Sequence, residues 1–139
     1  MIARTRLAVV RAAVAELCAH GIAGADVGRI AVAAGVDEPV VRDTWPHPDE
    51  LLREALEAAL AGLDTGGADG LAAHLRQAGV TGLLASLVDA SWRAPFWAEV
   101  LAGVVNRIDA TAGDAAARLV YRALVAHGAG GAAVQAPAP

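Results

Sequence analysis

The most constraining feature of the chain is the stretch DVGRIAVAAGVDEPVVRDTW, which spans residues 26–45. Val27, Ile30 and Ala34 recur at the spacing that places apolar side chains on one face of a helix. Gly35 follows them, and glycine is the residue that most readily takes the left-handed conformation at a helix C-terminus. The pattern predicts a short helix that ends in a tight turn at Gly35.

A second short helix is predicted directly after that turn. Asp37 is a good N-cap residue, because its carboxylate can accept the free N–H groups of the next turn. Pro39 suits the first turn, where its missing N–H costs nothing, and Pro46 marks the end of the helix. Val41 and Trp45 supply the apolar spacing between the two prolines. Two short helices on a glycine turn predict a helix-turn-helix, whose second helix fits the DNA major groove.

The flanking residues extend this pattern into a resemblance to a known family. Gly21 followed by IAVAAGVDEPVVRDTWPHPDELL resembles the N-terminal domain of the TetR family of bacterial repressors. That family has an apolar helix ending in Gly, then IA-x-x-AGV, a short recognition helix ending in an aromatic, and an acidic start to a fourth helix. The resemblance covers residues 4–63. The matched residues are Ala13, Gly21, Val27, Ile30, Ala31, Ala34, Gly35, Val36, Trp45, Asp49 and Leu51.

The resemblance implies a transcriptional regulator, expected to be a repressor, that binds double-stranded DNA as a homodimer. A ligand bound in the C-terminal part would then change the spacing of the two recognition helices. Much of the usual effector-domain length is missing after residue 63, so the dimerisation helices are expected to be shortened. The alternative is a TetR-like protein that has lost DNA binding and serves as a ligand-binding or protein-interaction module.

The residues predicted to face DNA lie in the N-terminal arm and around the two short helices. Arg42 is the only basic residue of the second helix, at a position where similar proteins often contact a phosphate through Tyr. The simpler interpretation of the other arginines is that they are solvated surface charges. The predicted DNA-binding residues are Arg4, Arg6, Arg29, Glu38, Val40, Arg42, Thr44 and His47.

The charge balance of the chain weakens the prediction of DNA binding. The formal net charge is −4, and residues 1–63 carry six arginines and nine carboxylates, a net charge of −3. Attraction to phosphates supplies much of the affinity of proteins for DNA. The acidic balance therefore favours the alternative in which DNA binding is lost.

The whole chain is predicted to be all-α, because no segment alternates with the period of two typical of a half-exposed strand. Further helices are predicted at residues 5–20, 48–63, 71–78, 81–92, 95–108 and 112–127, with a glycine-rich break at residues 64–70. We expect three parts: a helix-turn-helix domain at 1–47, a connecting helix and short C-terminal helical bundle at 48–127, and a disordered tail at 128–139.

A cluster of aromatic residues indicates a ligand pocket in the C-terminal part. Trp92, Phe96 and Trp97 lie close together in the sequence, and pockets for small apolar ligands are mostly apolar with few polar groups. His74 and Tyr121 are the polar residues predicted to join them. The other interpretation, which the pattern favours, is that the three rings fill the core between short alanine-rich helices.

Other classes of function find little support in the sequence. The four histidines are scattered without metal-ligand spacing, so neither an enzyme, a cofactor nor a metal site is expected. Cys18 is the single cysteine, which excludes an intramolecular disulfide and favours a buried thiol. No run of 18 apolar residues and no signal-peptide core is present, so we expect a cytoplasmic protein with no membrane partner.

Overall fold

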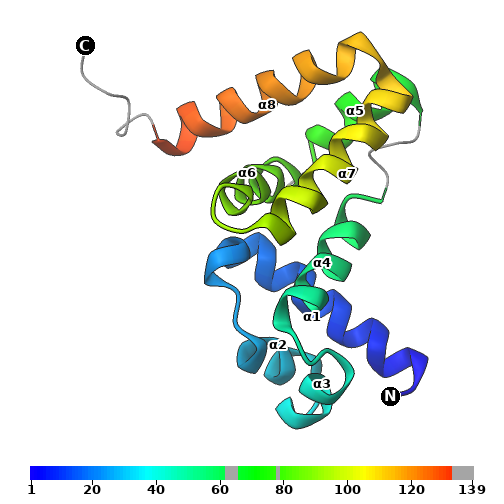
Figure 1. The fold of residues 1–139 in the computed structure, drawn as a ribbon, viewed down its shortest axis with the longest axis vertical. Helices are drawn as coiled ribbons and strands as arrows, with labels where there is room; N and C mark the ends of the chain where they lie inside the picture. The colour runs from blue at the N-terminus through cyan, green and yellow to red at the C-terminus, as the bar shows by residue number, and fades with distance from the viewer. Residues whose placement is uncertain (62–65, 78, 133–139) are drawn as a thin grey trace. The chain divides into compact units, whose positions relative to one another are not determined.

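The computed structural model describes residues 1–61, 66–77 and 79–132, and within them it is all-α, as predicted (Figure 1). The helices are α1 (Ala3–Gly24), α2 (Val27–Ala34), α3 (Glu38–Thr44), α4 (Pro48–Ala59), α5 (Gly67–Leu75), α6 (Val80–Ser91), α7 (Pro95–Ala112) and α8 (Asp114–Ala132). The chain divides into two compact units, unit 1 at Met1–Ala61 and unit 2 at Gly62–Pro139.

Unit 1 is built around α1, which packs against α2 and α4. Leu51 and Leu56 of α4 are fully buried, as are Val9 and Ala13 of α1. Because α4 completes this core, the division falls after Ala61 and not after residue 47, where the sequence placed it. The predicted boundary was placed before α4, but the apolar stripe of α4 packs in the N-terminal core.

The buried side chains of α1 form one stripe along the helix. It runs through Val9, Ala13, Glu16 and Leu17, at the i, i+4, i+7, i+8 spacing of one helix face. Cys18 lies beside this stripe and is exposed, so the prediction of a buried thiol is wrong. In an alanine-rich helix the hydrophobic pattern marks the buried face only weakly, because alanine occurs on every side.

One described helix is long and apolar enough to cross a membrane by length and composition. This helix is α1, with 22 residues and a mean hydropathy of 1.4 over its most apolar window, of which 28% is buried. α1 qualifies by its average hydropathy, although the sequence contains no unbroken apolar run of 18 residues. A helix in a protein core passes the same test, and α1 contributes Val9, Ala13 and Leu17 to the core of unit 1.

Unit 2 contains α5 to α8, and its core lies where α6, α7 and α8 contact one another. The core side chains include Leu83 and Leu87 of α6, Trp97 and Val104 of α7, and Ala116 of α8. α6 begins at Val80 and α8 at Asp114, close to their predicted starts at residues 81 and 112. α7 begins at Pro95, as predicted. The last helix is longer than predicted.

The predicted disordered tail begins inside a helix. The sequence placed residues 128–139 in a tail, but α8 continues to Ala132. The glycines in this segment lower helix propensity without forbidding a helix, and the alanines between them favour it. Residues 133–139 lie outside the described part of the chain.

Candidate nucleic-acid interface

The turn between α2 and α3 has the predicted geometry. The side chain of Asp26 accepts a hydrogen bond from the backbone N–H of Arg29 at 3.0 Å and so caps α2. Gly35 has φ 71° and ψ 32°, the left-handed conformation. The backbone N–H of Val36 then donates to the carbonyl of Ala31 at 3.0 Å, which closes the helix end. The prediction for Gly35 is confirmed.

The start of α3 differs from the prediction in one respect. Asp37 occupies the N-cap position, but its side chain makes no capping hydrogen bond. Its backbone carbonyl accepts the N–H of Val40 at 3.0 Å, and Pro39 lies in the first turn as expected. The Asp37 carboxylate is therefore an exposed negative charge that is not used to complete the helix.

The short helix α3 has one buried side and one exposed side. Val41 and Trp45 are buried in unit 1, at 1% and 5% exposure. Val40 remains 40% exposed, and Arg42 and Asp43 are exposed beside it. The hydroxyl of Thr44 donates to the carbonyl of Val40 at 3.2 Å, inside the same helix. The exposed side of α3 is small and carries charges of both signs.

Arg42, the main predicted phosphate contact, pairs with an acidic residue of its own helix. Its Nε donates to Oε2 of Glu38 at 3.1 Å, and both side chains are about half exposed. An exposed pair of this kind contributes little to stability, so separating it costs little. Both members were predicted to face DNA, and the structure brings them together.

Arg29 is held by contacts within unit 1. Its guanidinium donates to the Glu16 carboxylate at 2.8 Å and to the carbonyl of Gly24 at 2.6 Å. The backbone N–H of Asp26 also donates to Glu16, at 2.9 Å, and the Glu16 side chain is only 9% exposed. Arg29 therefore neutralises a buried carboxylate. Sequence reasoning missed Glu16, although an acidic residue next to Leu17 on a buried helix face was a signal.

Arg4 and Arg6 were predicted to lie in an N-terminal arm, but both lie in the first turns of α1, and they differ from each other in their contacts. Arg6 forms an ion pair with Glu54 of α4, and its guanidinium lies 4.8 Å above the centre of the Trp45 ring. Arg4 is exposed and has no ion pair within the described residues. His47 is exposed at the N-cap position of α4 and makes no capping hydrogen bond. Of the predicted basic contacts, Arg4 is the one whose charge is free for a partner.

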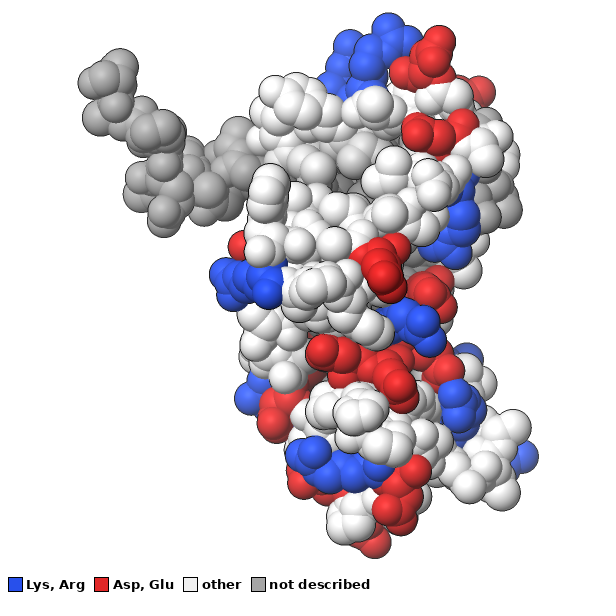
Figure 2. Space-filling view, viewed as in Figure 1, with Lys and Arg blue, Asp and Glu red and all other residues white. Residues whose placement is uncertain are grey.

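The charges of unit 1 therefore alternate and do not form a basic surface. On the face shown in Figure 2, blue and red side chains are interspersed over the part that holds α2 and α3. Three of the four predicted arginines are paired with carboxylates, namely those of Glu16, Glu38 and Glu54. A phosphate backbone would have to compete with these carboxylates for each guanidinium.

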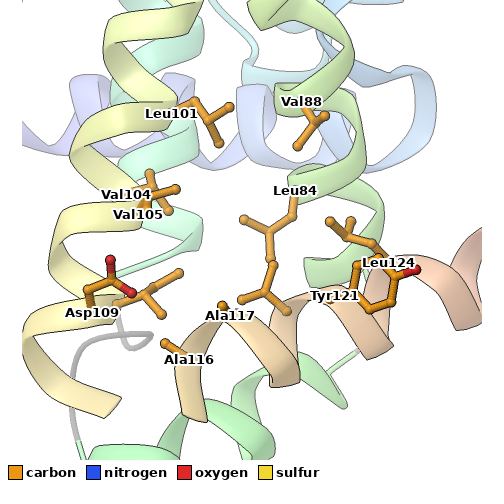
Figure 3. Close-up of a pocket in the computed structure, with 12 residues that line it drawn as sticks. Leu84, Val88, Leu101, Val104, Val105, Asp109, Ala116, Ala117, Tyr121 and Leu124 are labelled. Atoms are coloured by element: carbon orange, nitrogen blue, oxygen red, sulfur yellow. The ribbon is translucent and has the colours of Figure 1, made fainter. Parts of the chain in front are cut away.

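A separate candidate site lies in unit 2. An apolar groove of about 300 Å³ runs between α6, α7 and α8 and is partly open to solvent. Side chains of Leu84 and Val88, of Leu101 and Val104, and of Leu124 point into it from the three helices (Figure 3). The polar residues of its lining are Asp109 and Tyr121.

The predicted pocket residues are only partly at this groove. Tyr121 lines it and is 69% exposed, whereas His74, Trp92, Phe96 and Trp97 are absent from its lining. Trp97 is buried and meets Phe96 edge-to-face, with ring centres 4.9 Å apart, as expected of rings that fill the core. Trp92 is 86% exposed, and the His74 ring contacts the carbonyl of Gly70 at 3.2 Å. The aromatic cluster does not form the groove, because aliphatic side chains from three helices do.

Within the described residues, no group of three or more histidine, cysteine or acidic side chains is arranged to hold a metal ion. A comparison with models of known protein families finds no match to the chain, and a comparison with curated proteins finds none either.

Proposed function

We propose that the chain is a helix-turn-helix transcriptional regulator of the TetR type. The observation that carries the proposal is the turn at Gly35, which joins two short helices of which the second is anchored by Val41 and Trp45 and exposes Val40 and Arg42. The buried side chains hold α3 in place while its other side stays exposed to a partner, the arrangement that DNA-binding helix-turn-helix proteins use. The resemblance of residues 4–63 to TetR repressors points the same way.

In this proposal the protein acts as a cytoplasmic repressor, and two copies bind one near-palindromic DNA site. The apolar groove in unit 2 would receive a small apolar ligand, since its lining is aliphatic apart from Asp109 and Tyr121. Exposed apolar residues on α7 and α8, among them Val105 and Val125, would supply the contact between copies.

A second candidate function is supported by a specific observation. Arg6, Arg29 and Arg42 are each engaged by a carboxylate of unit 1, and the unit carries more acidic than basic residues. This pairing favours a TetR-like module that no longer binds DNA and recognises a ligand or another protein. The two candidates differ in one property, attraction to phosphates.

A binding titration separates the two candidates. The full chain is mixed with fluorescein-labelled DNA duplexes of randomised sequence, and anisotropy is followed at low and at moderate salt. A regulator retains a subset of duplexes that share a near-palindrome, with affinity falling as salt rises. If no duplex is retained at low salt, where attraction is least screened, the regulator proposal fails and the second candidate stands.

A further inference from the structure

A surface hollow between α2 and α3 is lined by apolar side chains, here called its floor, and by acidic side chains, here called its rim. It has a volume of about 640 Å³. Its floor includes Ala31, Val32 and Val36, and Val32 is 83% exposed, the most exposed large aliphatic side chain described in unit 1. An aliphatic side chain this open to water gains from any apolar partner that covers it.

The rim of the hollow carries more acidic than basic side chains, although one of them, Glu38, also pairs with Arg42. Its acidic residues are Asp26, Asp37 and Glu38, and the single basic residue in the lining is Arg29. Arg29 already serves Glu16 and the carbonyl of Gly24, so it does not neutralise the rim. The Asp37 carboxylate has no partner within the described residues.

Two rim carboxylates converge on one glycine. A Cβ atom on Gly28 would lie 2.8 Å from Oε1 of Glu38 and 3.1 Å from Oδ2 of Asp26. Oε1 of Glu38 is the oxygen that Arg42 leaves free, because Arg42 bonds to Oε2. The missing side chain thus leaves space beside two carboxylate oxygens, of which Oδ2 of Asp26 also accepts the backbone N–H of Arg29. A guanidinium group presents several N–H donors in one plane and can bond to both at once.

We propose that this hollow binds an arginine-bearing, apolar segment of a partner protein. The arginine bridges Glu38 and Asp26 over Gly28, and neighbouring aliphatic side chains of the segment cover Val32. The chemistry matches on both counts, since the rim is acidic and the floor apolar, whereas a phosphate backbone would meet three carboxylates. An occupant here would also cover part of the surface that the proposed regulator presents to DNA.

The test uses the full chain and a fluorescein-labelled peptide that alternates leucine and arginine. Anisotropy should rise on mixing at low salt and fall as salt increases. A matched peptide with glutamate in place of arginine should not bind. Equal binding of the two peptides would overturn the proposal, because the acidic rim would then play no part.

Three variants locate the binding site. Gly28→Ala places a methyl group between the two carboxylates and should weaken peptide binding about fivefold, the loss expected for one exposed charged contact. Glu38→Gln should do the same, whereas Glu57→Gln, an equal loss of charge on the exposed side of α4, should have no effect. Val32→Ser should also weaken binding, with Leu7→Ser, at an exposed aliphatic residue of α1 outside the hollow, as its control.

The variants also separate binding from folding. Gly28 lies inside α2 without a positive φ, and the flexible Glu38 side chain can move away from an added methyl group, so alanine should leave the urea midpoint close to that of the wild type while the peptide affinity falls. An unchanged peptide affinity in Gly28→Ala would overturn the proposed bridge. If DNA duplexes are retained and the arginine peptide is not, this inference fails while the proposed regulator stands.

Discussion

Arg29 donates to the Glu16 carboxylate at 2.8 Å and thereby fastens α2 to α1. Glu16 is nearly buried, whereas the Arg29 side chain is 52% exposed. Replacing Arg29 with alanine leaves a nearly buried carboxylate without its countercharge. The expected loss is about 1–2 kcal/mol in the free energy of unfolding, below the cost at fully buried pairs because water reaches the guanidinium.

Urea unfolding followed by circular dichroism measures this loss. Arg11→Ala is the matched control, because Arg11 is exposed on the same unit and has no ion pair within the described residues. Its stability should change by no more than about 0.5 kcal/mol. Equal midpoints for the two variants would show that the pair with Glu16 does not hold α2 in place.

Two glycine substitutions are expected to have opposite signs. Gly35 has φ 71° and no atom close to the position of a Cβ, so the cost of Gly35→Ala comes from the backbone conformation alone. That cost is about 1–2 kcal/mol. Gly103 lies inside α7 with equally open space, and Gly103→Ala should stabilise by about 0.5–1 kcal/mol. Thermal unfolding of both variants checks the contrast, and a stabilised Gly35→Ala would contradict the left-handed turn.

Features of the fold that depend on neighbouring residues were predictable from the sequence, and features that depend on distant residues were not. The turn at Gly35 and the starts of α4 and α7 at Pro48 and Pro95 were predictable, because a glycine or proline marks each of them in the local sequence. The ion pairs that engage the predicted DNA-contacting arginines were not predictable. Arg6 pairs with Glu54, 48 residues away, and Arg29 pairs with Glu16, 13 residues away. Such pairs depend on how helices pack, which alanine-rich stripes specify weakly.

The groove in unit 2 is the second feature that the sequence did not locate. The aromatic residues were predicted to form the pocket because they are few and lie close together in the sequence. Trp97 is instead buried in the core and Trp92 is exposed, and neither lines the groove. The groove is built mainly from Leu and Val side chains on three helices, and of the predicted pocket residues its lining includes Tyr121. Aliphatic stripes occur on every helix of this unit, so none of them alone indicated an opening.

Filling the groove should abolish binding of an apolar ligand. Ala117 lines the groove on α8 and is exposed, so Ala117→Trp places an indole in the space at little cost to folding. Wild-type protein should enhance the fluorescence of the neutral probe N-phenyl-1-naphthylamine, and the variant should not. Ala102→Trp, an exposed position of α7 outside the lining, is the control and should retain the enhancement. A retained signal in Ala117→Trp would place the probe elsewhere.

The proposed homodimer is expected to depend on the exposed apolar residues of α8. Tyr121 and Val125 lie four residues apart on one face of the helix and are 69% and 50% exposed. Sedimentation should show a dimer at tens of micromolar, about the range in which a weak interface forms. Val125→Glu should give a monomer with unchanged helix content, whereas Ala126→Glu, on another face of α8, should remain a dimer. A monomeric wild type at this concentration would refute the proposed contact.

The last prediction concerns Arg42 and Glu38, whose pairing opposes DNA binding in two ways. Glu38 occupies the guanidinium through a 3.1 Å contact, and it adds a negative charge beside the expected path of the phosphates. Glu38→Gln should therefore strengthen binding to every duplex, because it frees Arg42 and removes a repulsion. Arg42→Ala should weaken binding to every duplex and reduce the slope of log affinity against log salt by about one unit, the effect of losing one phosphate contact.

Anisotropy titrations at several salt concentrations measure both effects, with Arg118→Ala on α8 as a control that removes the same charge from unit 2. Its salt slope should equal that of the wild type. Stronger DNA binding by Glu38→Gln together with weaker binding by Arg42→Ala would identify Arg42 as a phosphate contact for which Glu38 competes. If Glu38→Gln leaves DNA affinity unchanged, the pair with Glu38 does not restrain Arg42.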